Sequence, residues 1–257
     1  MATNETTRGK EFALKRVQAG RNAEKRVASA LFGAVKKIVA ASRTYINDGK
    51  LTREQDYINE ARKLTAETAT DIESYLTAYS RVASKTLGVS ADVVDDYLEG
   101  RIFGKTFTQR NDRYLSYFAE DMVRMVKAGV LLGYSESQIL SAIRTGYKEP
   151  YKTSVITKAK RFDVNIDVPS YGRGIFKSSY QNIARNVKAT IALAWGQAEQ
   201  EYGRRSGATG FLVFRGSSYP CPTCDDETAY VHRFGDPFPP FHVSCVCYIQ
   251  FIYENKK

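Results

Sequence analysis

The first 150 residues carry apolar side chains at the spacing of amphipathic helices. From Val27, apolar residues recur every three or four positions through Leu31, Val35 and Ile38. This period places them on one face of a helix. A second long run of the same kind follows Thr108. The pattern therefore predicts a series of helices over this part of the chain.

Local signals mark where some of these helices begin. Asn47-Asp48-Gly49 is a turn sequence. Thr52 is followed three positions later by Gln55, and Ser135 is followed by Gln138 at the same spacing. Both pairs have the sequence of a capping box, in which the two residues satisfy each other's backbone N–H groups. We predict a helix start at each pair.

The pattern changes between residues 145 and 175. Apolar and polar residues alternate from Phe162 to Val168, which predicts a short strand within a loop region. Helical spacing resumes near Ser178. Residues 211–214 and 246–252 then read as two further strands.

These elements predict a mainly α protein, with a multi-helix N-terminal part and a small C-terminal α+β unit that contains a short antiparallel sheet. We divide the chain into a basic helical arm (1–50), a helical domain (51–147), a connection of loop and short strand (148–177), and a C-terminal helix with the small α+β unit (178–257). At 257 residues, the chain is long enough to bury a hydrophobic core that does not depend on disulfides or metal ions for its stability.

Charge is concentrated at the N-terminus. The net charge is +10, and residues 1–50 contain 11 Lys and Arg against four Asp and Glu. Such a segment suits contact with phosphates, because each neutralised phosphate releases counterions. It is equally suited to an acidic protein partner or to a solvated helix face. The cations are interleaved with alanines rather than aromatic residues, which disfavours nucleic acid as the partner.

The sequence gives no sign of a membrane anchor or a secretory signal. No apolar run approaches the length of a membrane-spanning helix. The first 12 residues also lack the apolar stretch of a signal peptide. We therefore expect a reducing cytosol, where disulfides rarely persist.

Every cysteine and histidine of the chain lies in one short window. They are Cys221, Cys224, His232, His242, Cys245 and Cys247. The spacing is C-x2-C, 17 residues, then H-x2-C-x-C. Two intervening residues allow a tight turn to bring both side chains to one metal, so this pattern predicts zinc. A disulfide is the alternative.

Tetrahedral zinc needs four ligands, and our first choice is Cys221, Cys224, His242 and Cys245. If residues 245–247 are extended, the two cysteines point to opposite faces and only one can bind. A local turn would allow Cys247 to replace Cys245 or His242. His232 lies outside both pairs and is a less favoured ligand. Four protein ligands leave no position for water, so we expect one structural zinc per chain.

Catalytic hypotheses fit the sequence less well. Pro220 through Cys224 matches half of the zinc deaminase signature, but that chemistry needs an upstream H-x-E, and no histidine precedes Cys221. A hydrolase could use Asp225, Asp226 and Glu227 with a second metal. A solvated acidic loop explains these three residues more simply. We expect no enzyme activity.

The last third of the chain carries an ordered set of motifs: a helix carrying Asn182-Ile183-Ala184-Arg185, a glycine-containing turn, a short strand, Cys221-x-x-Cys224, a proline-rich approach, and His242-x-x-Cys245-x-Cys247. This order resembles the phage Mu F-like head morphogenesis family, the minor head proteins of tailed phages. The resemblance covers roughly 110–252 and is specific from about residue 178. The family usually ends His-Pro-x-Cys-Arg-Cys, whereas Val243 and Val246 stand here in place of the proline and arginine.

This resemblance implies a structural minor head protein, associated with the portal or the capsid interior, that acts in head assembly or in DNA packaging and delivery. Its partners would be the phage portal, the major capsid protein or both, with packaged DNA as a further partner of residues 1–50. It would occur in the host cytoplasm during assembly and then in the virion. The alternatives are a zinc-containing nucleic-acid-binding regulator and, less favoured, a metal-dependent hydrolase.

Overall fold

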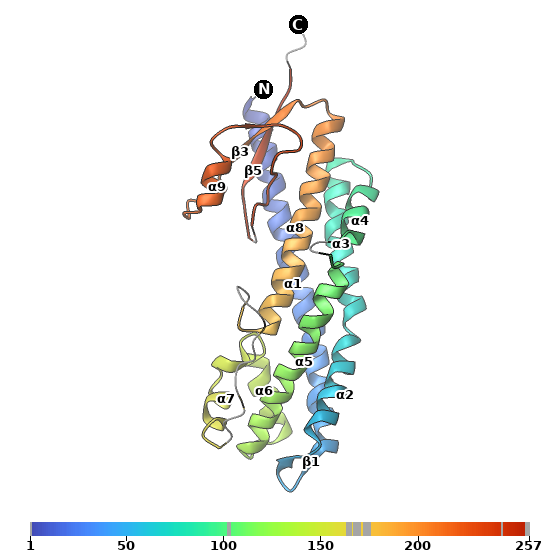
Figure 1. The fold of residues 1–257 in the computed structure, drawn as a ribbon, viewed down its shortest axis with the longest axis vertical. Helices are drawn as coiled ribbons and strands as arrows, with labels where there is room; N and C mark the ends of the chain where they lie inside the picture. The colour runs from blue at the N-terminus through green and yellow to red at the C-terminus, as the bar shows by residue number, and fades with distance from the viewer. Residues whose placement is uncertain are drawn as a thin grey trace. The chain divides into compact units, whose positions relative to one another are not determined.

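The computed structural model confirms the fold class: the protein is mainly helical and carries a small C-terminal antiparallel sheet (Figure 1). The structure describes residues 2–101, 104–162, 166, 171, 176–242 and 244–254, with side chains from residue 6 onward. Among the helices it describes, none combines the length and the apolar character needed to cross a membrane.

Nine α-helices and five strands make up the described part of the chain. The α-helices are α1 (Ala2–Ala41), α2 (Glu54–Ala66), α3 (Ala69–Leu87), α4 (Asp92–Glu99), α5 (Phe107–Leu131), α6 (Glu136–Gly146), α7 (Ser154–Ala159), α8 (Ser179–Arg205) and α9 (Pro222–Glu227). Short 3-10 helices span η1 (Ser42–Tyr45) and η2 (Pro150–Lys152). The strands are β1 (Ile46–Asn47), β2 (Lys50–Leu51), β3 (Gly210–Phe214), β4 (Val231–His232) and β5 (Tyr248–Ile252).

The chain divides into two compact units, each built from separate stretches of sequence. One unit comprises Met1–Lys25, Ser74–Phe107 and Val187–Lys257, and the other comprises Arg26–Glu73 and Thr108–Asn186. The candidate chemistry of the sequence lies in the first of these.

The second unit has a helical core with the predicted periodicity. Its fully buried side chains include Leu31, Ile38, Phe118, Met122 and Ile143. The Ser135–Gln138 capping box at the start of α6 is confirmed, with both of its reciprocal hydrogen bonds present.

The predicted helix start at Thr52 is wrong. Helix α2 begins at Glu54, and its N-cap is Arg53, which has a left-handed backbone and forms no side-chain cap. Thr52 instead closes the β1–β2 hairpin, because its backbone N–H and its hydroxyl both donate to the carbonyl oxygen of Tyr45. The turn sequence is confirmed: Asp48 and Gly49 form the two-residue loop of this hairpin, both with positive φ.

The first unit contains a three-stranded antiparallel sheet in the order β4-β3-β5. Phe211 of β3 faces His232 on β4 and Phe251 on β5. Beside the sheet, the N-terminal part of α1 lies close to β5 (Figure 1). Gly9 permits this approach, since a Cβ atom there would lie 2.0 Å from the carbonyl oxygen of Ile249.

Two predicted strands differ in outcome. The strand at residues 211–214 is confirmed by β3. The strand predicted from Val246 begins only at Tyr248, because the chain is still leaving a tight turn at Ser244, which has a φ of 67°. Most of the strand predicted from Phe162 to Val168 lies outside the described residues, and Phe162 itself is in a turn.

Candidate metal centre

The first cysteine pair is presented by the start of helix α9. Cys221 is the N-cap of this helix, with an extended backbone, and Pro222 occupies its first turn. The carbonyl oxygen of Cys221 accepts from the backbone N–H of Asp225. One helical turn thus separates Cys221 from Cys224, which brings both sulfur atoms to the same side.

The second group of donors comes from the turn before β5. The backbone N–H of Cys245 donates to the carbonyl oxygen of His242, 3.1 Å away, and Ser244 between them has a left-handed backbone. This turn reverses the chain and presents His242 and Cys245 toward the first pair.

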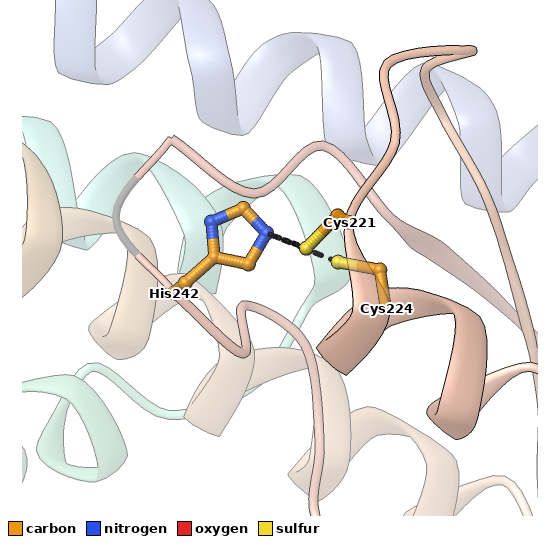
Figure 2. Close-up of side chains that lie close together, drawn as sticks. All are labelled: Cys221, Cys224 and His242. Carbon is orange, nitrogen blue, oxygen red and sulfur yellow. Dashed lines mark hydrogen bonds between the residues drawn. The ribbon is translucent and has the colours of Figure 1, made fainter.

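Figure 2 shows Cys221, Cys224 and His242 pointing toward one another. His242 Nε2 lies 3.3 Å from the Sγ atom of Cys221 and 3.0 Å from that of Cys224. The Sγ atoms of Cys224 and Cys245 are 3.9 Å apart, and the four cysteines are free thiols. Soft sulfur and imidazole donors at these separations form a site that could hold a metal ion.

Cys247 belongs to the same cluster. The ligand atoms of Cys224, Cys245 and Cys247 all lie within 4.8 Å of one another, as do those of Cys221, Cys224 and His242. Cys245 and Cys247 therefore do not point to opposite faces, as an extended segment would require. The donors thus form two groups of three that share Cys224, and we call these five residues together the metal cluster.

Three of the five donors are buried in the core of the C-terminal unit. Cys224, Cys245 and Cys247 are each less than 5% exposed, whereas Cys221 is half-buried and His242 exposed. The fully buried cluster around them adds four apolar side chains, which are Phe211, Val213, Ile249 and Phe251. Partly buried apolar side chains pack against this cluster, and they are Tyr202, Ala208, Phe234, Phe238 and Phe241. Thiols thus occupy nearly half of this small core.

The buried thiols differ in acidity. A hydrogen bond from Cys247, opposed by burial, lowers the pKa of Cys245 to about 5. The positive charge of Arg16 acts in the same direction. Burial raises the pKa of Cys224 to about 12, and the hydrogen bond to Cys245 raises the pKa of Cys247. Without a metal, Cys245 is the thiol that most readily becomes a thiolate ligand.

Arg16 of helix α1 is a part of this centre that sequence reasoning missed. Its side chain is 1% exposed, and its Nη2 donates to the carbonyl oxygen of Cys247 over 2.7 Å. Its Nε and Nη1 have no hydrogen-bond partner among the described residues. A buried cation is costly unless negative charge lies near it. Arg16 therefore gives the thiol cluster a fixed positive charge.

Glu199 of helix α8 is a second buried ionisable group that interacts with Arg16. It is 1% exposed, and its Oε1 has no hydrogen-bond partner in the described part of the chain. Burial raises the pKa of Glu199 to about 7, while the positive charges of Arg16 and Arg8 act in the opposite direction. The arginine at position 16 is thus attracted both to this carboxyl and to the thiols.

The remaining histidine has a different place. His232 is fully buried, its ring stacks on Phe211 with 4.9 Å between centroids, and its Nε2 lies 2.7 Å from the carbonyl oxygen of Glu227. It belongs to neither group of candidate ligands. His232 packs in the sheet, as its position outside both pairs suggested.

The acidic loop is engaged in local contacts. Asp225 forms an ion pair with Arg215, and Glu227 accepts from the hydroxyl of Tyr230. The groups of potential metal ligands found among the described residues include neither Asp225, Asp226 nor Glu227.

No family model, no curated protein and no solved structure matches this chain.

Replacing Arg16 with methionine should weaken metal binding. The methionine fills similar space but removes the donor to Cys247 and the positive charge that favours thiolates. Loss of such an outer contact typically costs about tenfold or more in metal affinity. Co²⁺ titration, followed by thiolate-to-metal absorption, measures it. Lys15→Met, which removes an exposed cation from the same helix, is the control. Equal affinities for both variants would contradict this role.

Glu199→Gln should make stability less dependent on pH. The pKa of Glu199 is about 7 in the folded protein against its ordinary value of 4.5. As pH rises through this window, the unfolded chain ionises first, so the native protein loses stability. The loss relative to the glutamine variant is about 3 kcal/mol. Urea unfolding at several pH values measures the difference, and parallel profiles would contradict it.

Proposed function

We propose that the metal cluster holds one structural Zn²⁺. The observation that carries this proposal is the set of donor distances. A tetrahedral site with Zn–S bonds of about 2.3 Å places its sulfur atoms about 3.8 Å apart. The Sγ atoms of Cys224 and Cys245 are separated by 3.9 Å. Thiolate and imidazole donors are also the set that zinc prefers.

We assign Cys221, Cys224, His242 and Cys245 as the four ligands. Cys224 is shared by both donor groups, and Cys245 is the buried thiol whose pKa is lowered. Cys247 then keeps its proton and donates to the Cys245 sulfur. Three thiolates with one divalent cation leave one net negative charge, which Arg16 offsets. With four protein ligands, the ion would support folding and leave no open position for catalysis.

We further propose that the chain is a structural minor head protein of a tailed phage, with no enzyme activity. What supports this is the order of elements in the C-terminal unit: helix α8, strand β3, the Cys221–Cys224 pair, the His242–Cys245–Cys247 turn, and strand β5. The motifs that resemble the Mu F-like family follow one another in this same order along the sequence. The partners would be the portal or the major capsid protein, within the host cytoplasm and then the virion.

Metal analysis of cysteine variants tests the ligand assignment. The native chain should contain about one zinc, and Cys224→Ser, Cys245→Ser and His242→Ala should lose it. Cys247→Ser should retain zinc, because its role is to donate a hydrogen bond. Elemental analysis after exhaustive dialysis is the measurement. A zinc-free native chain would contradict the site, and zinc retained by Cys245→Ser but lost by Cys247→Ser would reverse the assignment.

Mass spectrometry of purified tailed particles tests the phage assignment. In particles produced by cells that carry this gene, the chain should be present in far fewer copies than the major capsid protein. Free host cytosol, fractionated in parallel, is the control. Detection of the chain only in the cytosolic fraction, with none in intact particles, would contradict the proposal.

A further inference from the structure

A groove outside the metal cluster lies between the N-terminal part of α1 and the turn that leads into β5. Its volume is about 460 Å³, within the range of sites that accept a few side chains. All its lining residues belong to the first unit: Lys10, Ala13, Leu14, Val17, Arg21, Arg215, Gly216, Val246 and Tyr248.

The floor of the groove depends on a close backbone contact. A Cβ atom at Gly216 would lie 1.9 Å from the carbonyl oxygen of Val246, so only glycine allows the segment after β3 to lie against the segment before β5. This contact leaves the side chain of Val246 half-buried next to the groove. Val17 and the buried Ala13 add further apolar surface.

One stripe of α1 forms the other wall. Lys10, Leu14, Val17 and Arg21 follow one another at intervals of three or four residues, which places them on the same face of the helix. Leu14 is 70% exposed, although it lies between these neighbours. Leu14 lines the groove together with Val17 and Val246, and an apolar surface of this kind with charged residues at its rim is typical of a site that a partner covers.

The charge of the lining is of one sign. It contains three cations, Lys10, Arg21 and Arg215, and no acidic residue. Arg215 is already paired with Asp225. Lys10 and Arg21 form no ion pair with any residue that the structure describes, and Lys10 Nζ lies 5.6 Å from the centre of the Tyr248 ring. The two ends of the stripe thus offer unpaired positive charge on either side of Leu14.

We propose that this basic groove binds an acidic amphipathic segment of a partner protein. An apolar side chain of the partner would cover Leu14, Val17 and Val246, while its carboxylates would pair with Lys10 and Arg21. The apolar floor favours a protein over a nucleic acid. A phosphate backbone gains nothing from covering leucine and valine, and the one aromatic ring in the lining, Tyr248, is already stacked on Phe214.

Fluorescence anisotropy with the full-length chain tests the groove. The probe is a fluorescein-labelled acidic peptide whose leucines are spaced along one face of a helix. The control is a peptide of the same composition in which the leucines are placed at scrambled positions. The native chain should bind the patterned peptide about tenfold more tightly than the scrambled one, because only the former presents apolar and acidic groups together.

Variants locate the binding. Lys10→Glu/Arg21→Glu should weaken binding of the patterned peptide by about tenfold or more, through charge repulsion at both ends. Leu14→Ser, at an exposed position, should weaken it without affecting the fold. The matched control is Lys15→Glu/Lys85→Glu, which makes the same change of charge at exposed cations of the same unit outside the groove.

Three results would overturn the proposal. The first is absence of binding by the patterned peptide. The second is an equal loss of affinity in the Lys10/Arg21 and Lys15/Lys85 variants, which would indicate diffuse electrostatic attraction. The third is a short DNA duplex that binds the native chain in competition with the peptide and more tightly than it. This proposal rests on the lining residues and not on the head-protein assignment. Its failure would therefore leave that assignment unchanged, and the particle experiment would still test it.

Discussion

The small C-terminal sheet depends on what fills its centre, where three thiols take the place of apolar side chains. The sheet and turns fully bury four apolar residues and three cysteines, and a partly buried layer of mainly aromatic side chains packs against them. The strands are joined by long irregular segments. Ordering a backbone has an entropic cost for each residue, and a core of this size offsets little of it. A structural zinc is worth roughly 10–16 kcal/mol of apparent binding free energy coupled to folding. With zinc bound, as we propose, metal–thiolate bonds stabilise the unit where a larger hydrophobic core would otherwise do so.

Arg16 connects this unit to the start of the chain. Its hydrogen bond to the Cys247 carbonyl joins residues 231 positions apart, and its charge lies near both the thiols and Glu199. Gly9 brings the same stretch of α1 against β5. The N-terminal segment is therefore part of the metal-bearing unit, and the cations of α1 have distinct roles: Arg16 is buried beside the cysteines, while Lys10 and Arg21 line a groove exposed to a partner.

The sequence predicted most of what depends on local chemistry. Helical periodicity, the Ser135–Gln138 capping box and the clustering of the cysteines with His242 are all found in the structure. The errors have non-local causes. Thr52 does not cap a helix because its donors are used by Tyr45 across a hairpin. β5 starts late because the turn at Ser244 brings both following cysteines to one cluster. The signal for Arg16 was its position: it lies four residues after Phe12 and three before Ala19, on the face of α1 that the structure buries.

Amide hydrogen exchange, compared between the zinc-loaded and the zinc-stripped chain, tests most directly whether the metal replaces a core. We predict that removal of zinc abolishes amide protection in α9 and in the turn from His242 to Cys247. It should weaken protection in β3 and β5 and leave protection in α5 unchanged. Protection in these C-terminal segments that is the same with and without metal would contradict this prediction, because the apolar side chains around the thiols would then be sufficient to hold the sheet together.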